Sequence, residues 1–210
     1  MKARPGYPLP DVPADPTPDK LREAAARCRA CDLYEPATQV VIGEGPPGAR
    51  VMLVGEQPGD REDLAGQPFV GPAGRVLDEA LERAELPRED VYLTNAVKHF
   101  RYKLRGKRRI HQRPDRWQVS ACLPWLDAEL AMVRPEAVVL MGATAAQALL
   151  GPQVRIGRDR GHRLDSELAS LVTVTAHPSS ILRVRGADER HAAMDALVTD
   201  LEAVVGWISG

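Results

Sequence analysis

The chain has 210 residues, of which 44% are hydrophobic, and its formal net charge is −1. This length is typical of one domain that buries a core without disulfides, and the hydrophobic content excludes a disordered chain. The near-neutral charge excludes a uniformly basic or acidic protein, so a charged partner would have to be recognised by a local patch.

The N-terminal residues 1–17 are rich in proline, and we expect them to be extended or disordered. Thr17 is placed to cap a helix that begins at Pro18 and carries Cys28 near its end. From residue 18 to residue 210 we expect a single domain.

Neither a signal peptide nor a membrane span is predicted. The N-terminal segment lacks the apolar run of a signal peptide. The longest mostly apolar stretch, 137–150, is too short to cross a membrane and is interrupted by Gly142 and Thr144. We therefore expect a soluble, cytoplasmic protein, and the absence of an extended heptad pattern favours a monomer.

Short apolar runs alternate with helical patterns along the rest of the chain. The runs typical of buried parallel strands are 51–54, 91–94, 137–140 and 171–175. The helical patterns are 73–84, 114–133, 143–150 and 189–205. This alternation predicts an α/β layered fold with a central parallel sheet. Binding sites in such sheets lie at the carboxyl ends of the strands, where this sequence places its polar and glycine-rich segments.

A basic run follows the second predicted strand. Residues 98–116 contain nine Lys or Arg residues and one acid, Asp115. Such a run in a near-neutral chain is typical of a phosphate-binding surface. The alternative is a solvated loop, which gains nothing from like charges at this density. The run therefore favours contact with nucleic acid.

The three cysteines form an incomplete ligand set. Two residues separate Cys28 from Cys31, and Cys122 lies on the predicted helix after the basic run. An odd number of cysteines with one C-x2-C pair favours a reducing compartment and a metal or cluster site over a disulfide framework.

Several segments resemble the motifs of the uracil-DNA glycosylase superfamily. They are GEQPGDREDLAGQPFVGPAGR (55–75), TNAVKHF (94–100) and HPSSILR (177–183), and they match the iron–sulfur branch, family four. The segment GKRRIHQ (106–112) resembles the insert of the X-type (UdgX-like) members, which attach covalently to uracil-containing DNA. The resemblance extends from about Cys28 to Arg183. It implies a three-layer α/β/α sandwich around a four-stranded parallel sheet, and uracil-containing DNA as the partner.

The resemblance implies a pocket for a uracil flipped out of DNA. Glu56 would activate a water, and the backbone N–H of Gln57 would donate to uracil O2. Phe69 would stack on the base, Asn95 would pair with its N3–H and O4, and His177 would donate to O2 as negative charge develops. Without the resemblance, these residues have structural alternatives: a structural carboxylate for Glu56, core packing for Phe69, a turn cap for Asn95 and a satisfied imidazole for His177.

Hydroxyl and cationic groups near these motifs are suited to binding DNA phosphates. The predicted DNA contacts are Lys107, Arg108, Arg109, Ser179, Ser180 and Arg183.

His111 lies within the X-type insert, and the resemblance implies that it is a covalent nucleophile. A neutral imidazole that reaches C1′ before water forms an N–C bond, and the adduct persists because it has no good leaving group. Spacing alone instead favours a phosphate contact for His111. In that case the chain would be an ordinary multiple-turnover glycosylase that uses a water activated by Glu56. A third alternative is a non-catalytic iron–sulfur protein that binds DNA.

Family-four proteins usually carry a fourth cysteine after the second strand, where this chain has His99. The resemblance implies a structural [4Fe–4S] cluster held by Cys28, Cys31, His99 and Cys122. Three cysteines and one histidine also suit a structural zinc ion, which the residues alone leave open.

Overall fold

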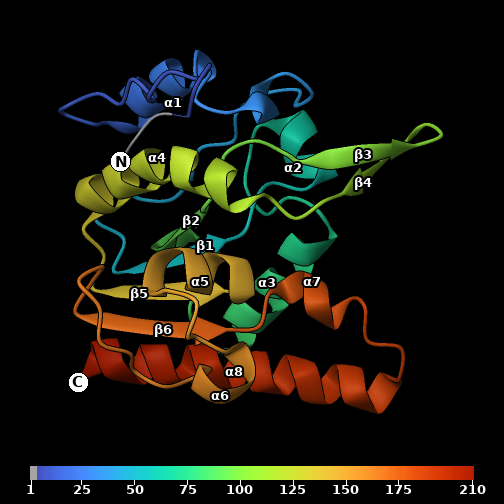
Figure 1. The fold of residues 1–210 in the computed structure, drawn as a ribbon. Helices are drawn as coiled ribbons and strands as arrows, with labels where there is room; N and C mark the ends of the chain where they lie inside the picture. Colours follow the sequence, from blue (N-terminus) through green and yellow to red (C-terminus); the bar gives the residue numbers. More distant parts are fainter. Residues whose placement is uncertain (1–3) are drawn as a thin grey trace.

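The computed structural model describes residues 4–210, and its centre is a four-stranded parallel sheet (Figure 1). The strands are β1 (Val51–Gly55), β2 (Val91–Asn95), β5 (Ala137–Met141) and β6 (Leu171–Thr175), in the order β2–β1–β5–β6. Their first residues pair across the sheet, so the four carboxyl ends lie along one edge. The predicted α/β fold with a four-stranded parallel sheet is confirmed.

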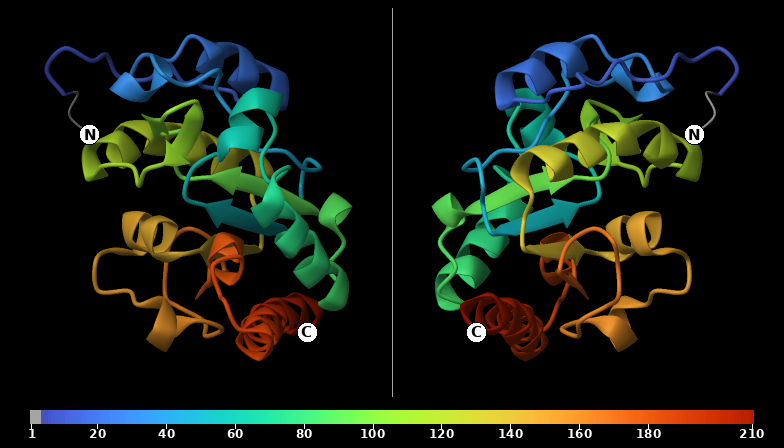
Figure 2. Two further views of the ribbon diagram at one scale, coloured as in Figure 1. Left: turned by 90° about the vertical axis from the view of Figure 1, so that its right-hand side faces the viewer. Right: turned by 90° about the vertical axis from the view of Figure 1, so that its left-hand side faces the viewer.

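Helices cover both faces of this sheet. They are α1 (Pro18–Ala26), α2 (Asp60–Ala65), α3 (Pro72–Arg83), α4 (Arg116–Val133), α5 (Ala143–Leu150), α6 (Ile156–Asp159), α7 (Pro178–Ile181) and α8 (Ala187–Ser209). Figure 2 shows α3 and α8 on one side of the sheet and α4 and α5 on the other. Alternate residues of β1 enter the two cores: Val51 and Leu53 pack with α3 and α8, and Met52 and Val54 pack with α4 and α5. Burial on both faces explains why β1 is apolar without alternation.

The helix boundaries follow local capping signals. The Thr17 hydroxyl accepts a hydrogen bond from the Lys20 backbone N–H, and α1 begins at Pro18 as predicted. The helix predicted for 114–133 begins two residues later, at Arg116, because Asp115 and Gln118 form a capping box. Residues 4–17 contain turns but no helix or strand, and Tyr7 packs on Trp117 of α4, with 5.3 Å between ring centroids. Residues 1–3 of the predicted extended segment lie outside the described residues.

The basic run forms a β-hairpin that the sequence did not predict. Strands β3 (Tyr102–Arg105) and β4 (Arg108–His111) pair antiparallel, and Gly106 takes a positive φ of 61° at the turn. The hairpin projects from the body of the molecule (Figure 1). Its side chains are mostly exposed, so it lacks the apolar face by which strands are recognised.

One prediction for the basic run is wrong. The sequence places Lys98 in the predicted phosphate-binding surface, but its side chain is fully buried and pairs with Glu129 of α4 at 2.5 Å. A buried lysine needs such a partner because an unpaired charge in the interior is strongly disfavoured.

In the part of the chain that the structure describes, no helix is long and apolar enough to span a membrane.

Candidate active site

A cavity of about 800 Å³ opens at the carboxyl ends of the strands. All four strands contribute: Glu56 follows β1, Asn95 ends β2, Thr144 follows β5 and His177 follows β6. The predicted site residues that line it are Glu56, Gln57, Phe69, Asn95, His111, His177, Ser179, Ser180 and Arg183. Residues far apart in the sequence thus meet at the edge where open α/β sheets bind ligands.

Three of these side chains converge on Gly55. A Cβ atom at Gly55 would clash with Asn95 Oδ1, and would lie 2.8 Å from Phe69 Cζ and 3.4 Å from His177 Nε2. Asn95 is 3% exposed, and its buried Oδ1 accepts no hydrogen bond from the residues described. Because buried acceptors are normally paired, this oxygen is available to a donor on a ligand.

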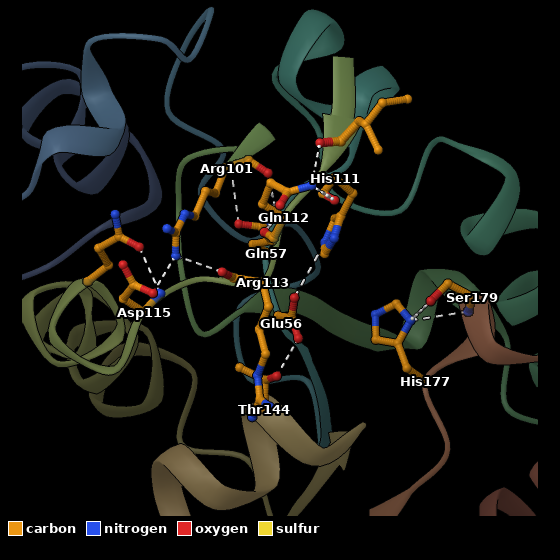
Figure 3. Close-up of polar contacts among 12 residues, drawn as sticks. Glu56, Gln57, Arg101, His111, Gln112, Arg113, Asp115, Thr144, His177 and Ser179 are labelled. Atoms are coloured by element: carbon orange, nitrogen blue, oxygen red, sulfur yellow. Dashed lines mark hydrogen bonds and ion pairs between the residues drawn. The ribbon is translucent and has the colours of Figure 1, made fainter. Parts of the chain in front are cut away.

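The hydrogen bonds of His177 define its tautomer. Its Nδ1 accepts from the Ser179 backbone N–H at 3.1 Å, so in the neutral ring the proton is on Nε2 (Figure 3). The pKa of His177 is lowered to about 4, chiefly by burial and to a lesser extent by the neighbouring His111 and Arg183. At neutral pH the cavity therefore contains an uncharged N–H donor beside the free acceptor of Asn95.

Phe69 forms a wall of the same space. Its ring is 5% exposed and stacks against His177, with 6.2 Å between ring centroids. Its backbone has a φ of 56°, a left-handed conformation that costs a non-glycine residue about 1–2 kcal/mol. Such a conformation persists only where the surrounding structure enforces it.

A buried network of hydrogen bonds holds the backbone at Asn95. Lys98 Nζ donates to the Asn95 carbonyl oxygen at 2.7 Å and to the Thr94 hydroxyl at 2.7 Å. Glu129, also fully buried, accepts from Lys98 Nζ at 2.5 Å and from the Thr94 hydroxyl at 2.7 Å. The end of β2 is therefore held by a charge pair inside the protein.

Glu56 and His111 meet at the mouth of the cavity. His111 Nε2 lies 3.4 Å from Glu56 Oε1, while Glu56 Oε2 accepts from the Thr144 hydroxyl (Figure 3). Burial lowers the pKa of His111 below its ordinary value of 6.5; the Glu56 carboxylate raises it and Arg183 lowers it. The imidazole is half exposed and unprotonated at neutral pH, so it combines access with a free lone pair.

The side chain of Gln57 anchors the hairpin. Its Nε2 donates to the carbonyl oxygens of Arg101 and Gln112, both at 3.1 Å, and its Oε1 accepts from the Arg101 backbone N–H at 3.1 Å (Figure 3). These bonds join the turn after β1 to both ends of the hairpin, so the amide is not free to contact a base. Any contact from Gln57 to uracil is left to the backbone.

Arg109 also differs from its predicted environment. Its guanidinium contacts Asp60 and Asp63, each at 2.5 Å, and its side chain is 16% exposed. Two carboxylates thus neutralise a residue that we expected to bind phosphate. Lys107 and Arg108 are exposed beside the hairpin turn and remain suited to phosphate contact.

The serines after β6 hold His177. Ser179 Oγ lies 2.9 Å from His177 Nδ1, and the Ser180 hydroxyl donates to the His177 carbonyl oxygen at 2.7 Å. Arg183 donates to Ser179 Oγ at 3.3 Å and lies on the rim. The two hydroxyls therefore have an orienting role in addition to the predicted contact with DNA.

The three cysteines share one core region, the cysteine cluster of Cys28, Cys31 and Cys122. The pKa of Cys31 is raised to about 11 and that of Cys122 to about 12, in both cases chiefly by burial; the charge of Lys98 opposes the rise at Cys122. Cys28 Sγ accepts from Trp125 Nε1 at 3.3 Å, and Cys122 Sγ accepts from the Lys98 backbone N–H at 3.2 Å. N–H donors aimed at sulfur are typical of iron–sulfur sites, so this donor set fits a cluster.

His99 is buried, and burial lowers its pKa to about 4, so its imidazole is neutral. The charge of Asp63 raises this pKa and that of Arg29 lowers it, both by less than burial does. Among residues 4–210, no three His, Cys, Asp or Glu side chains are close enough to hold one metal ion.

Thr144 is a site residue that no sequence motif singled out. Its hydroxyl fixes one oxygen of Glu56, which leaves the other directed toward His111. Its position just after the third predicted strand, at the edge where the other site residues lie, could have indicated a place in the site.

Comparison with known proteins agrees with this geometry. The family model of the uracil DNA glycosylase superfamily matches residues 42–202. The type-4 uracil-DNA glycosylase of Thermotoga maritima is 36% identical over 189 residues, which cover 90% of this chain and 93% of that protein. The type-4 enzyme of Pyrobaculum aerophilum is 35% identical over 83% of this chain and 91% of its own length. The chain therefore belongs to the uracil DNA glycosylase superfamily, in its family-four-like branch.

Proposed function

We propose that this chain excises uracil from DNA by cleaving the N-glycosidic bond. The observation that carries the proposal is the free Asn95 acceptor beside the neutral His177 donor, around the space left by Gly55. Uracil presents an N3–H donor to Asn95 and an O2 acceptor to His177. Cytosine has an acceptor at N3 and an amino donor at position 4, so it would leave buried groups unpaired.

The base must leave the helix to reach this cavity. Phe69 then provides a stacking surface, and stacking contributes about 1–3 kcal/mol per base. As the glycosidic bond lengthens, negative charge develops on uracil and positive charge on the sugar. The His177 Nε2–H stabilises the uracil anion, and the Glu56 carboxylate stabilises the sugar cation.

A direct test of excision uses oligonucleotides that are identical except for one uracil, thymine or cytosine. We expect alkali-labile abasic sites only in the uracil strand. Asn95→Leu is the matched pocket variant, because it keeps the side-chain volume but removes both hydrogen-bonding groups. The proposal fails if the wild-type protein produces no abasic or protein-bound product from the uracil strand.

Two routes complete the reaction. In the hydrolytic route, which the names of the type-4 relatives support, Glu56 directs a water onto C1′ and the enzyme turns over. The second candidate is attack by His111, which the unprotonated imidazole 3.4 Å from Glu56 favours. The Nε2 lone pair forms a bond to C1′ as the C1′–N1 bond breaks, uracil leaves with the bonding electrons, and the resulting imidazolium loses its Nδ1 proton.

The two routes predict different products. Hydrolysis yields free abasic DNA and many turnovers per protein molecule. Attack by His111 yields one protein–DNA adduct per molecule, and this adduct survives SDS and heat.

We also propose that the cysteine cluster and His99 hold a [4Fe–4S] cluster. The soft thiolate donors and the N–H donors to Cys28 and Cys122 support this assignment. When bound, the cluster supplies a structural link and takes no part in base removal. It would join α1 to the segment after β2 and to α4. Iron, sulfide and zinc analysis of purified protein tests the assignment: about four irons and four sulfides per chain support it, and one zinc without sulfide contradicts it.

A further inference from the structure

The left-handed backbone of Phe69 requires support from the surrounding structure. This conformation is unfavourable for an aromatic residue, and a rotation of the adjacent peptide would relieve it. Such a rotation would swing the ring away from His177 and from the space above Gly55. Contacts from other residues are therefore needed to hold this peptide in place.

Arg88, just before β2, makes the contacts that do so. Its Nη2 donates to the Pro68 carbonyl oxygen at 3.2 Å, and its Nη1 donates to the Phe69 carbonyl oxygen at 3.3 Å. Nη1 also contacts Asp78 of α3 at 2.5 Å, which fixes the guanidinium. A planar guanidinium can bond two successive carbonyl oxygens at once, whereas a lysine ammonium at the end of a flexible stem cannot do so in the same geometry.

Gly74 closes the other side of this peptide. A Cβ at Gly74 would collide with the Phe69 carbonyl oxygen, so only glycine lets the first turns of α3 approach it. The Phe69 carbonyl thus lies between the helix backbone and the Arg88 guanidinium. Arg88 does not line the cavity, and its side chain is 34% exposed.

We propose that Arg88 is a positioning residue for base recognition: it fixes the Pro68 and Phe69 carbonyls and so keeps the Phe69 ring ready to stack on the flipped base. This inference rests on the proposed excision of uracil. It assigns part of the affinity for the base to a side chain outside the pocket.

The test compares Arg88→Ala with Arg83→Ala in single-turnover excision and in inhibition by free uracil. Arg83 is a matched control because it forms a partly exposed ion pair from α3 to Asp195, at 2.6 Å, away from the cavity. We expect Arg88→Ala to slow excision about tenfold and to weaken inhibition by free uracil by a similar factor, within the contribution of one stacked base. Arg83→Ala should stay within about twofold of wild type in both assays, as is usual for exposed ion pairs.

A double-mutant cycle with Phe69→Ala separates positioning from general stability. If Arg88 acts through the ring, Arg88→Ala has no further effect once Phe69 is alanine. Arg88→Lys, which keeps the charge but not both carbonyl bonds, should be impaired while remaining folded. Wild-type behaviour of Arg88→Lys and Arg88→Ala, or an equal loss in the Phe69→Ala background, would overturn the inference. Failure of the wild-type chain to act on uracil would instead overturn the proposed function.

Discussion

The base pocket and the β3–β4 hairpin are anchored in contrasting ways. Asn95 ends a central strand and is supported by the fully buried pair of Lys98 and Glu129. The hairpin is mostly exposed, and its ends are tied to the turn after β1 by the neutral amide of Gln57. The proposed recognition of the base therefore depends on the core of the fold, whereas the placement of His111 depends on contacts of the hairpin with the turn after β1 and with α2.

Removal of the buried Glu129 carboxylate should have the largest effect, a loss of stability. Glu129→Ala leaves the Lys98 ammonium buried without its partner, and we expect a loss of about 3–5 kcal/mol in the free energy of unfolding. Chemical denaturation measures this loss. Glu136→Ala is the control, because Glu136 forms a more exposed pair with Arg50 and should cost less than about 1 kcal/mol. Equal losses in the two variants would show that the buried network does not support the fold.

A substitution at Asn95 tests recognition of the base and leaves the buried pair of Lys98 and Glu129 in place. Asn95→Asp replaces the amide donor with a second acceptor, which repels uracil O4, and we expect uracil excision to fall about 100-fold or more. The ratio of kcat/KM for uracil to that for cytosine measures the effect, because cytosine offers an amino donor at the same position. An unchanged ratio would remove Asn95 from the pocket.

Gln57→Ala tests the hairpin anchor. Loss of its three hydrogen bonds loosens the two ends of the hairpin, although Arg109 still contacts Asp60 and Asp63. On the His111 route we expect the rate of adduct formation to fall about tenfold, equivalent to roughly 1.4 kcal/mol of positioning. Inhibition by free uracil should stay unchanged, because the pocket wall of Phe69, Asn95 and His177 is intact. A parallel loss in both measurements would show that Gln57 supports the pocket rather than the hairpin.

The smallest expected effect concerns the exposed part of the hairpin. Replacement of both Lys107 and Arg108 by alanine should weaken DNA binding at low salt and lower the salt dependence of binding by about two phosphate contacts. Titrations at several salt concentrations measure the slope. Lys20→Ala and Arg22→Ala together provide a control with the same change in charge on α1, and they should leave the slope unchanged.

The central sheet could be predicted because each strand is a short apolar run buried on both faces. The common edge of Glu56, Asn95 and His177 could also be predicted, since each follows such a run. The hairpin could not, because the side chains of its strands are mostly exposed and form no apolar face. The environments of Lys98 and Arg109 depend on acids far along the chain: Glu129 is 31 residues after Lys98, and Asp60 is 49 residues before Arg109. No local pattern reports such pairings, so both residues looked like surface cations.

The most direct test of the account is a comparison of wild type and His111→Ser on one labelled uracil oligonucleotide, with heat and SDS before electrophoresis. The His111 route predicts a slow band for the wild-type protein that is absent with thymine. It also predicts that His111→Ser forms no such band but still produces abasic DNA, because the pocket is intact. A heat-stable band from His111→Ser would assign the attack to another residue. Multiple turnovers without a band in wild type would show that water, directed by Glu56, completes the reaction.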